Sequence, residues 1–278
     1  MNSSWQTFGH NRIKNILNKQ LESAKLPHAY LFVGPEGLGK KTLALEFAQK
    51  VLQTERLSNH PDFELLDAEG EITMEQTLVF ISRLGLMPFV AGKKIALINN
   101  AQNLNIQSSN ALLKTLEEPS PSTVIILVAT GGILPTITSR CQVLSFSPFA
   151  KSELKEFAAR ENITFSDRLA EMSFGSLGRL KALAGQPEFL QIEQQAIEEY
   201  ETAVKSTLSQ KFISINNLAE LELQQLRQRL LTWLFWQRHK LKNAPEDYTK
   251  VRALNDSINN LAKNQNKKLV LQSLMLKI

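Results

Sequence analysis

Hydrophobic and polar positions in the first half of the chain alternate between short apolar runs and helical patterns. The runs, each bounded by Gly, Pro, Asn or Asp, predict strands at residues 29–33, 63–66, 94–98, 123–130 and 142–146. Helices are expected between them, the first from Lys40 to Leu52, where Leu43, Phe47 and Val51 recur at a spacing of four. This rhythm is typical of βαβ units and predicts a parallel sheet.

A further helix of this half is expected before the fourth strand. Ser108 or Ser109 can cap its start, and Pro119 ends it. Three leucines share its apolar face: Leu112, Leu113 and Leu116. Its exposed face carries Lys114, Glu117 and Glu118.

After Pro148 the strand signals stop, and the second half is predicted to be all-α. Breaks are expected near residues 175–178, 185–187 and 243–245. Two apolar stripes at helical spacing indicate a helix-bundle core: Leu223, Leu226, Leu230 and Leu234, then Val251, Leu254, Ile258 and Leu261. Beside the first stripe, Trp233, Phe235 and Trp236 could stack on nucleic-acid bases, but their spacing favours packing.

Composition and charge are those of a soluble protein with more than one domain. No apolar run approaches the roughly 20 residues of a membrane helix, and residues 1–10 resemble no targeting signal, so a cytoplasmic location is expected. The net charge of +5 allows an acidic partner such as nucleic acid, but no basic stretch is concentrated enough to form a binding site alone. Cys141 is the only cysteine, which excludes an internal disulfide and a cysteine-based zinc site.

Residues 34–40, with the sequence GPEGLGK, follow a predicted strand and open a predicted helix, which is the setting of a phosphate-binding loop. In such a loop the backbone N–H groups converge on phosphate oxygens and the lysine reaches the terminal phosphates. The candidate phosphate-contacting residues are Gly34, Gly37, Gly39, Lys40 and Thr42.

The catalytic positions around this loop carry the wrong residue types. A working loop places Ser or Thr after its lysine to bind Mg²⁺, but this chain has Lys41, and Thr42 is turned by about 100° along the helix. The strand that should end in carboxylates ends in Asn99 and Asn100, which lack the negative charge that holds Mg²⁺ and cannot act as a general base. We therefore expect no ATP hydrolysis and no metal ion. Weak ATP or ADP binding without turnover stays open, because Lys40 and the glycines are present.

Four further motifs occur in order: residues 27–32 (PHAYLF), 60–62 (HPD), 110–119 (NALLKTLEEP) and 134–141 (LPTITSRC). Together they resemble the bacterial clamp-loader family, the gamma/tau and delta-prime subunits of DNA polymerase III. Asn264, Gln265 and Asn266, followed by leucines, are similar to the last collar helix of delta-prime. The resemblance implies an α/β AAA+ P-loop domain (residues 1–147), a helical lid (148–186) and an all-α collar that oligomerises (187–278).

The resemblance also implies roles for single residues. Arg140 would be an arginine finger that acts in trans on the ATP of a neighbouring subunit, although spacing alone favours a local ion pair. Arg179 lies near the family's second sensor, and a structural role is favoured for it. Thr130 is a candidate for the first sensor. The four-cysteine zinc module of many members is missing between Lys41 and Asn59, so no zinc is expected.

The implied partners are gamma/tau and delta subunits in a hetero-pentamer and, through this complex, the beta sliding clamp and primed DNA, with no membrane. Two alternatives remain. A gamma/tau-type ATPase would hydrolyse ATP alone with Mg²⁺. A stand-alone nucleic-acid-binding protein would show steeply salt-dependent affinity for DNA.

Overall fold

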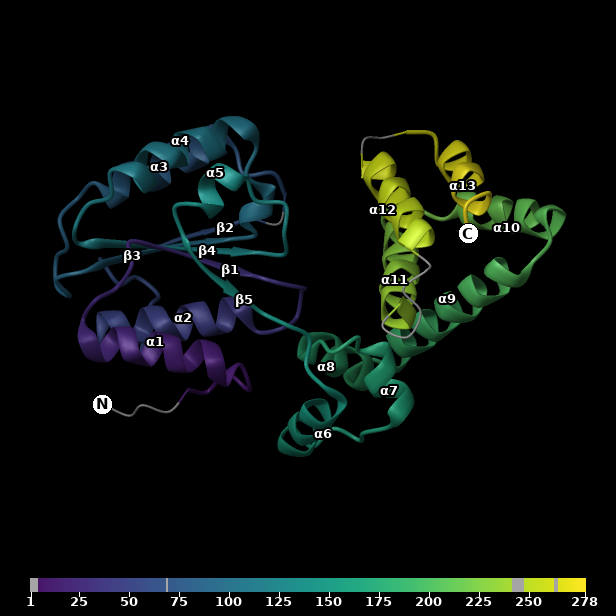
Figure 1. Ribbon diagram of the computed structural model, residues 1–278, viewed down its shortest axis with the longest axis horizontal. Helices are drawn as coiled ribbons and strands as arrows, with labels where there is room; N and C mark the ends of the chain where they lie inside the picture. Colours follow the sequence, from purple (N-terminus) through teal and green to yellow (C-terminus); the bar gives the residue numbers. More distant parts are fainter. Residues whose placement is uncertain (1–4, 69, 242–247, 263–264) are drawn as a thin grey trace. The chain divides into compact units, whose positions relative to one another are not determined.

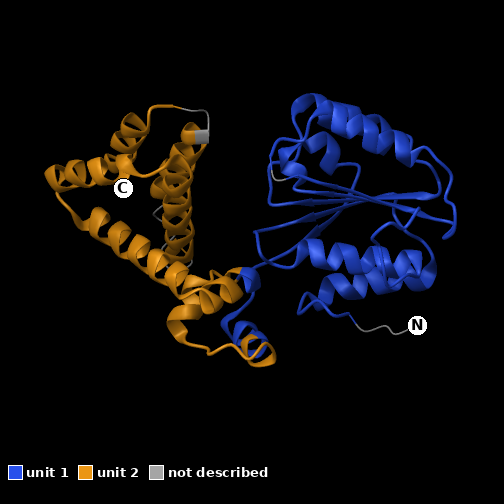
Figure 2. Cartoon of the chain, turned by 180° about the vertical axis from the view of Figure 1, so that it is seen from behind, with its two compact units in different colours: residues 1–157, 176–178 blue, residues 158–175, 179–278 orange. Residues whose placement is uncertain are grey.

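The computed structural model describes residues 5–68, 70–241, 248–262 and 265–278. The chain divides into two compact units, coloured separately in Figure 2: unit 1 comprises residues 1–157 and 176–178, and unit 2 comprises residues 158–175 and 179–278. The segment expected to form a lid, residues 148–186, thus contributes to both units.

Unit 1 is built on a five-stranded, fully parallel sheet. Its strands are β1 (Ala29–Val33), β2 (Phe63–Asp67), β3 (Lys94–Asn99), β4 (Thr123–Ala129) and β5 (Gln142–Ser145), in the spatial order β2-β3-β4-β1-β5. All seven residues of β4 are buried, which explains why this strand reads as a continuous apolar run rather than an alternation. The predicted strands and their parallel arrangement are confirmed.

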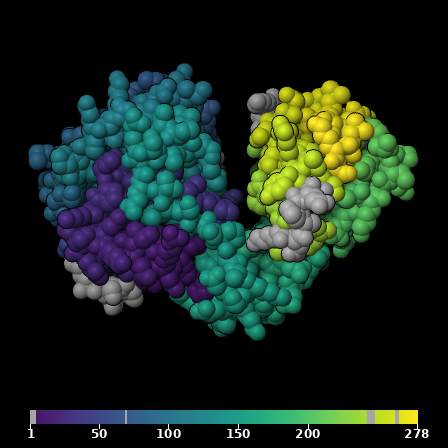
Figure 3. Space-filling model, in the orientation of Figure 1, coloured from purple at the N-terminus to yellow at the C-terminus, as the bar shows by residue number. Residues whose placement is uncertain are grey.

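Helices cover both faces of the sheet (Figure 1). α1 (Asn11–Ser23) and α2 (Lys40–Leu52) lie on one face; α3 (Met74–Leu84), α4 (Ile106–Glu117) and α5 (Pro135–Thr138) lie on the other. A 3₁₀ turn, η1, spans Ala101–Asn103. On the α3–α4 face the core includes Leu31, Ile98 and Leu112, each at most 2% exposed. In the space-filling view (Figure 3) the early described residues, in purple, form part of the surface of this unit.

The start of α4 differs from the prediction. Asn105, rather than Ser108 or Ser109, is the N-cap, and its side-chain oxygen accepts a hydrogen bond from Ser108 N at 2.8 Å. Asparagine caps helices as well as serine does, so the helix starts one turn earlier. Ser108 is instead buried and donates to Ile72 O at 2.8 Å.

The remaining helices are α6 (Lys151–Arg160), α7 (Asp167–Met172), α8 (Leu177–Gly185), α9 (Pro187–Lys205), α10 (Leu208–Glu220), α11 (Leu223–Leu241), α12 (Tyr248–Ala262) and α13 (Lys267–Met275). The breaks predicted near residues 175–178 and 185–187 are confirmed, and the one at 243–245 lies outside the described residues.

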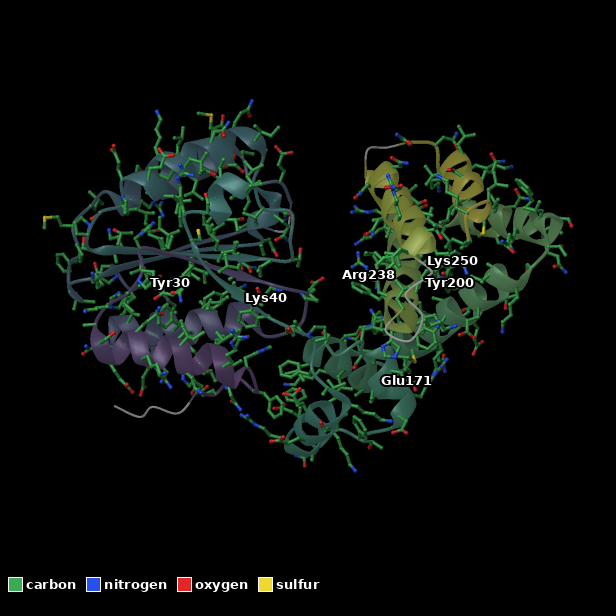
Figure 4. The ribbon with its side chains drawn as sticks, in the orientation of Figure 1. Tyr30, Lys40, Glu171, Tyr200, Arg238 and Lys250 are labelled. Carbon is green, nitrogen blue, oxygen red and sulfur yellow. The ribbon has the colours of Figure 1, made fainter. Side chains whose placement is uncertain are left out.

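The two apolar stripes form the core of unit 2. Leu226, Leu230 and Leu254 are fully buried. Trp233 packs against Tyr200 with ring centroids 5.3 Å apart, which supports packing over base stacking. Figure 4 labels Tyr200, whose hydroxyl donates to Gln237 Oε1 at 2.9 Å. Within the described parts of the chain, no helix combines the length and the apolar character needed to span a membrane.

Candidate functional site: the phosphate loop and its surroundings

The loop between β1 and α2 has the strand–loop–helix setting that the sequence predicted. Gly34, Gly37 and Gly39 have φ values of 153°, 73° and 81°, which L-residues rarely adopt. A Cβ atom on Gly34 would lie only 2.3 Å from Phe146 O. The tight turn therefore requires these glycines, and the close approach of Phe146, which follows β5, requires Gly34, whether or not a phosphate binds.

Lys40 is turned into its own loop. Its Nζ donates to Gly34 O at 2.6 Å and to Pro35 O at 2.5 Å, and the residue is 6% exposed. Burial lowers the pKa of Lys40 to about 8, although Glu36 raises it in part. Figure 4 marks Lys40 at the first turn of α2. The ammonium that would reach a terminal phosphate thus binds backbone carbonyls.

Two more carbonyls of the loop have partners within unit 1. Gly178 N donates to Gly37 O at 2.9 Å, and a Cβ on Gly178 would lie 3.1 Å from Gly37 Cα. His10 Nε2 lies 2.8 Å from Leu38 O and donates to it, since a carbonyl oxygen can only accept. Burial lowers the pKa of His10. The loop is therefore held by contacts from the chain itself.

The position that needs a Mg²⁺ ligand holds a protein cation instead. The Lys41 ammonium forms an ion pair with the Asp67 carboxylate at the end of β2. Asn99 Nδ2 donates to Asp67 Oδ1 at 2.7 Å. The hydrogen bond from Lys41, and then that from Asn99, hold the pKa of Asp67 below its usual value. Asn100 Nδ2 donates to Ala68 O at 3.2 Å.

These residues do not fit a magnesium–nucleotide complex. An ammonium and two amides replace the hydroxyl and carboxylate oxygens that Mg²⁺ prefers. The Asp67 carboxylate lies next to these residues, but its oxygens bind Lys41 and Asn99. Asp67 was missed by the sequence reasoning. Its position at the carboxyl end of a strand next to β3 was the signal that could have identified it, because such ends meet at one edge of the sheet.

Thr42, the hydroxyl nearest in sequence to the missing Mg²⁺ ligand, and Thr130, the first-sensor candidate, are both exposed. Thr42 is exposed on α2, one residue beyond Lys41. Thr130 follows β4 and is exposed, and its backbone N donates to Gln102 Oε1 at 3.1 Å.

Arg140 lies just after α5 and is fixed by two groups of its own unit. Its Nη2 pairs with Glu117 Oε1 at 2.5 Å, and its Nη1 donates to Thr136 O at 2.8 Å. The Arg140 and Glu117 side chains are 33% and 48% exposed. Next to it, burial raises the pKa of the Cys141 thiol to about 11. Arg140 thus combines the local ion pair that spacing favoured with an accessible guanidinium.

Arg179 is engaged inside unit 2. It forms a buried ion pair with Glu193, and its Nε donates to Met172 O at 2.8 Å. Glu193 is 1% exposed and also accepts from Thr232 Oγ1 at 2.7 Å and from Gln228 Nε2 at 3.2 Å. These contacts tie α8 to α9 and α11, while the residue that touches the phosphate loop is Gly178.

The aspartate of the 60–62 motif organises an exposed loop. Asp62 is fully buried and accepts hydrogen bonds from three consecutive backbone N–H groups, those of Phe89, Val90 and Ala91, at 2.6–2.8 Å. Burial alone would raise the pKa of Asp62, but these three bonds outweigh it and lower the pKa. The loop presents Met87 and Phe89, which are 87% and 85% exposed.

Comparisons with known proteins agree with this arrangement. A family model described as DNA polymerase III, delta subunit, matches residues 9–150, just over half of the chain. DNA polymerase III subunit delta' of Pseudomonas aeruginosa is 33% identical over 223 residues, covering 71% of this chain and 66% of the relative. The corresponding Bacillus subtilis protein is 28% identical over 210 residues, covering 68% and 64%. The matches thus span just under two thirds of these relatives.

A solved structure shows the same fold. It is a DNA polymerase III gamma subunit-related protein from Thermotoga maritima, with a TM-score of 0.51 and 19% identity, covering 94% of this chain and 97% of its own. The parallel sheet with its following helices is the AAA+ architecture that the sequence implied. By its sequence matches, the chain belongs to the DNA polymerase III delta subunit family.

Proposed function

We propose that this chain acts as the delta-prime subunit of the DNA polymerase III clamp loader and does not hydrolyse ATP itself. It joins gamma/tau and delta subunits in a hetero-pentameric ring in the cytoplasm. Arg140 reaches the ATP of a neighbouring gamma/tau subunit, and the ring loads the beta sliding clamp on primed DNA during replication. The relatives named delta' and the family match support this assignment.

The ion pair between Lys41 and Asp67 carries the proposal that the chain is inactive on its own. Where ATP hydrolysis needs Mg²⁺, the chain places an ammonium whose charge is already balanced by Asp67. Because Asn99 and Asn100 replace carboxylates, no side chain of this strand end can polarise an attacking water.

The accessible guanidinium of Arg140 carries the proposal that the chain acts on a neighbour. An arginine offers paired N–H donors to the charge that develops on a transferring phosphoryl group. Such fingers are worth about 10³–10⁵ in rate at the site they serve.

The test has two parts. First, the isolated chain is assayed for ATP hydrolysis with Mg²⁺. Brisk turnover would reject the inactive subunit and favour a gamma/tau-type ATPase. Second, the chain is assembled with gamma/tau, delta, clamp and primed DNA, and Arg140→Ala is compared with wild type. We expect assembly to be retained and ATP hydrolysis by the complex to fall. An unchanged rate would reject the role of Arg140.

The remaining alternative, a stand-alone nucleic-acid-binding protein, is tested by measuring the affinity of the isolated chain for primed DNA at several salt concentrations. Tight binding with a steep salt dependence, without partners, would favour a stand-alone nucleic-acid-binding protein.

A further inference from the structure

The carboxylate of Glu117 is well placed to control Arg140. Glu117 is the last residue of α4, and Arg140 follows α5 on the same face of the sheet. Their charged groups meet at 2.5 Å although 23 residues separate them in the chain. The contact therefore depends on the fold and not on sequence proximity.

Two different nitrogen atoms of the Arg140 guanidinium are anchored. Nη2 binds Glu117, and Nη1 binds Thr136 O at 2.8 Å, with Ser139 Oγ at 3.5 Å. Since the guanidinium is planar and rigid, two anchors at different nitrogens fix the orientation of its plane. An arginine has five N–H donors, so others remain for a phosphate.

We propose that Glu117 is a positioning residue: it orders the Arg140 side chain for presentation to the nucleotide of the neighbouring subunit. This inference rests on the proposed function of Arg140. Glu117 contacts neither nucleotide nor metal in this role and acts only through the arginine.

The physical reason is the conformational entropy of arginine. Its free side chain samples many rotamers, and ordering it costs up to about 2 kcal/mol. With a carboxylate anchor, the arginine side chain is already ordered in the folded chain, so binding of the neighbouring subunit does not have to order it. The alternative is a restraint, in which the carboxylate holds the cation away from phosphate. When the carboxylate is removed, the positioning role predicts slower ATP hydrolysis by the complex, and the restraint predicts faster hydrolysis.

The experiment uses the assembled complex of this chain with gamma/tau, delta, clamp and primed DNA. The part of the ATPase kcat that Arg140→Ala removes is defined as the Arg140-dependent rate. We expect Glu117→Ala to lower that rate about two- to fivefold at unchanged KM, since an exposed ion pair is worth roughly 0.5–1 kcal/mol. Glu117→Gln keeps an oxygen acceptor and should retain most of the rate.

Two controls make the result specific. Glu118→Ala removes the adjacent exposed carboxylate and should leave the rate unchanged. In the Arg140→Ala background, Glu117→Ala should have no further effect, because there is no finger left to position. Thermal unfolding of each variant shows whether the fold is retained.

Each outcome has a defined meaning. An unchanged or raised Arg140-dependent rate in Glu117→Ala overturns the positioning role, and so does an equal loss in both backgrounds. If Arg140→Ala itself leaves hydrolysis unchanged, the proposed function fails, and the inference falls with it. If Arg140→Ala lowers the rate while Glu117→Ala does not, only the inference fails.

Discussion

The Lys41 ammonium pairs with the Asp67 carboxylate at the carboxyl ends of the parallel strands. Lys41 lies on α2 and Asp67 ends β2, and 26 positions separate them in the chain. One substitution after the loop lysine thus both removes a metal ligand and supplies the cation that balances the nearby acid.

Replacing this cation should create a metal dependence. In the variant Lys41→Thr/Asn99→Asp/Asn100→Glu, the carboxylate at position 99 would lie beside Asp67, where Asn99 now lies 2.7 Å away. Two adjacent carboxylates repel unless a cation lies between them. We expect ATP affinity at least about tenfold higher with Mg²⁺ than with EDTA, measured with a fluorescent ATP analogue. Equal affinities would show that the introduced residues form no Mg²⁺ site and would contradict this account.

A side chain at Gly34 should destabilise unit 1. Gly34→Ala forces a Cβ atom to within 2.3 Å of Phe146 O at a φ of 153°. Strain and overpacking together predict a loss of about 2–5 kcal/mol in the free energy of unfolding, measured in urea. The matched control is Gly185→Ala, where nothing lies within 4 Å and helix propensity favours alanine. A small effect at Gly34 would mean that the backbone at Phe146 moves aside readily.

Breaking the buried ion pair of unit 2 should cost more than breaking an exposed one. Arg179→Met leaves the charge of Glu193 buried without its cation and should lower the free energy of unfolding by about 3–5 kcal/mol. Arg83→Met breaks the exposed pair with Glu64 and should cost less than about 1 kcal/mol. Similar losses in both variants, by thermal or urea unfolding, would contradict the structural role of Arg179.

The stability that Asp62 provides should depend on pH. Its folded pKa is lowered, so the unfolded chain binds more protons in acid; the stabilisation is complete above the unfolded value near 3.8 and is lost as the pH falls through the folded pKa. At neutral pH Asp62→Asn should cost roughly 2–4 kcal/mol. The difference from wild type should shrink below about pH 4, whereas Asp256→Asn, at an exposed position, should show little difference at any pH. A stability difference between wild type and Asp62→Asn that stays the same in acid would contradict this account.

The sequence predicted the features that depend on local pattern. The strands, the loop between β1 and α2 and the helical second half follow from periodicity and from the positions of Gly and Pro. The missing metal ligands were visible as residue types at fixed spacing.

What the sequence did not reveal were the partners of these residues. Lys41 meets Asp67, and Arg140 meets Glu117, across distances in the chain that no local pattern encodes. The predicted N-cap of α4 was also wrong. Several side chains near residue 105 can accept a hydrogen bond from a backbone N–H of the first turn, and tertiary packing selects among them.

Because the Asp62 carboxylate fixes the backbone of residues 89–91, the neighbouring position 87 offers a place to attach a dye. The chain has one cysteine, Cys141, whose pKa of about 11 makes it a slow nucleophile at neutral pH. A thiol introduced by Met87→Cys would be exposed and would react first with a maleimide. A fluorophore there would report on unit 1 while leaving the phosphate loop and Arg140 unmodified.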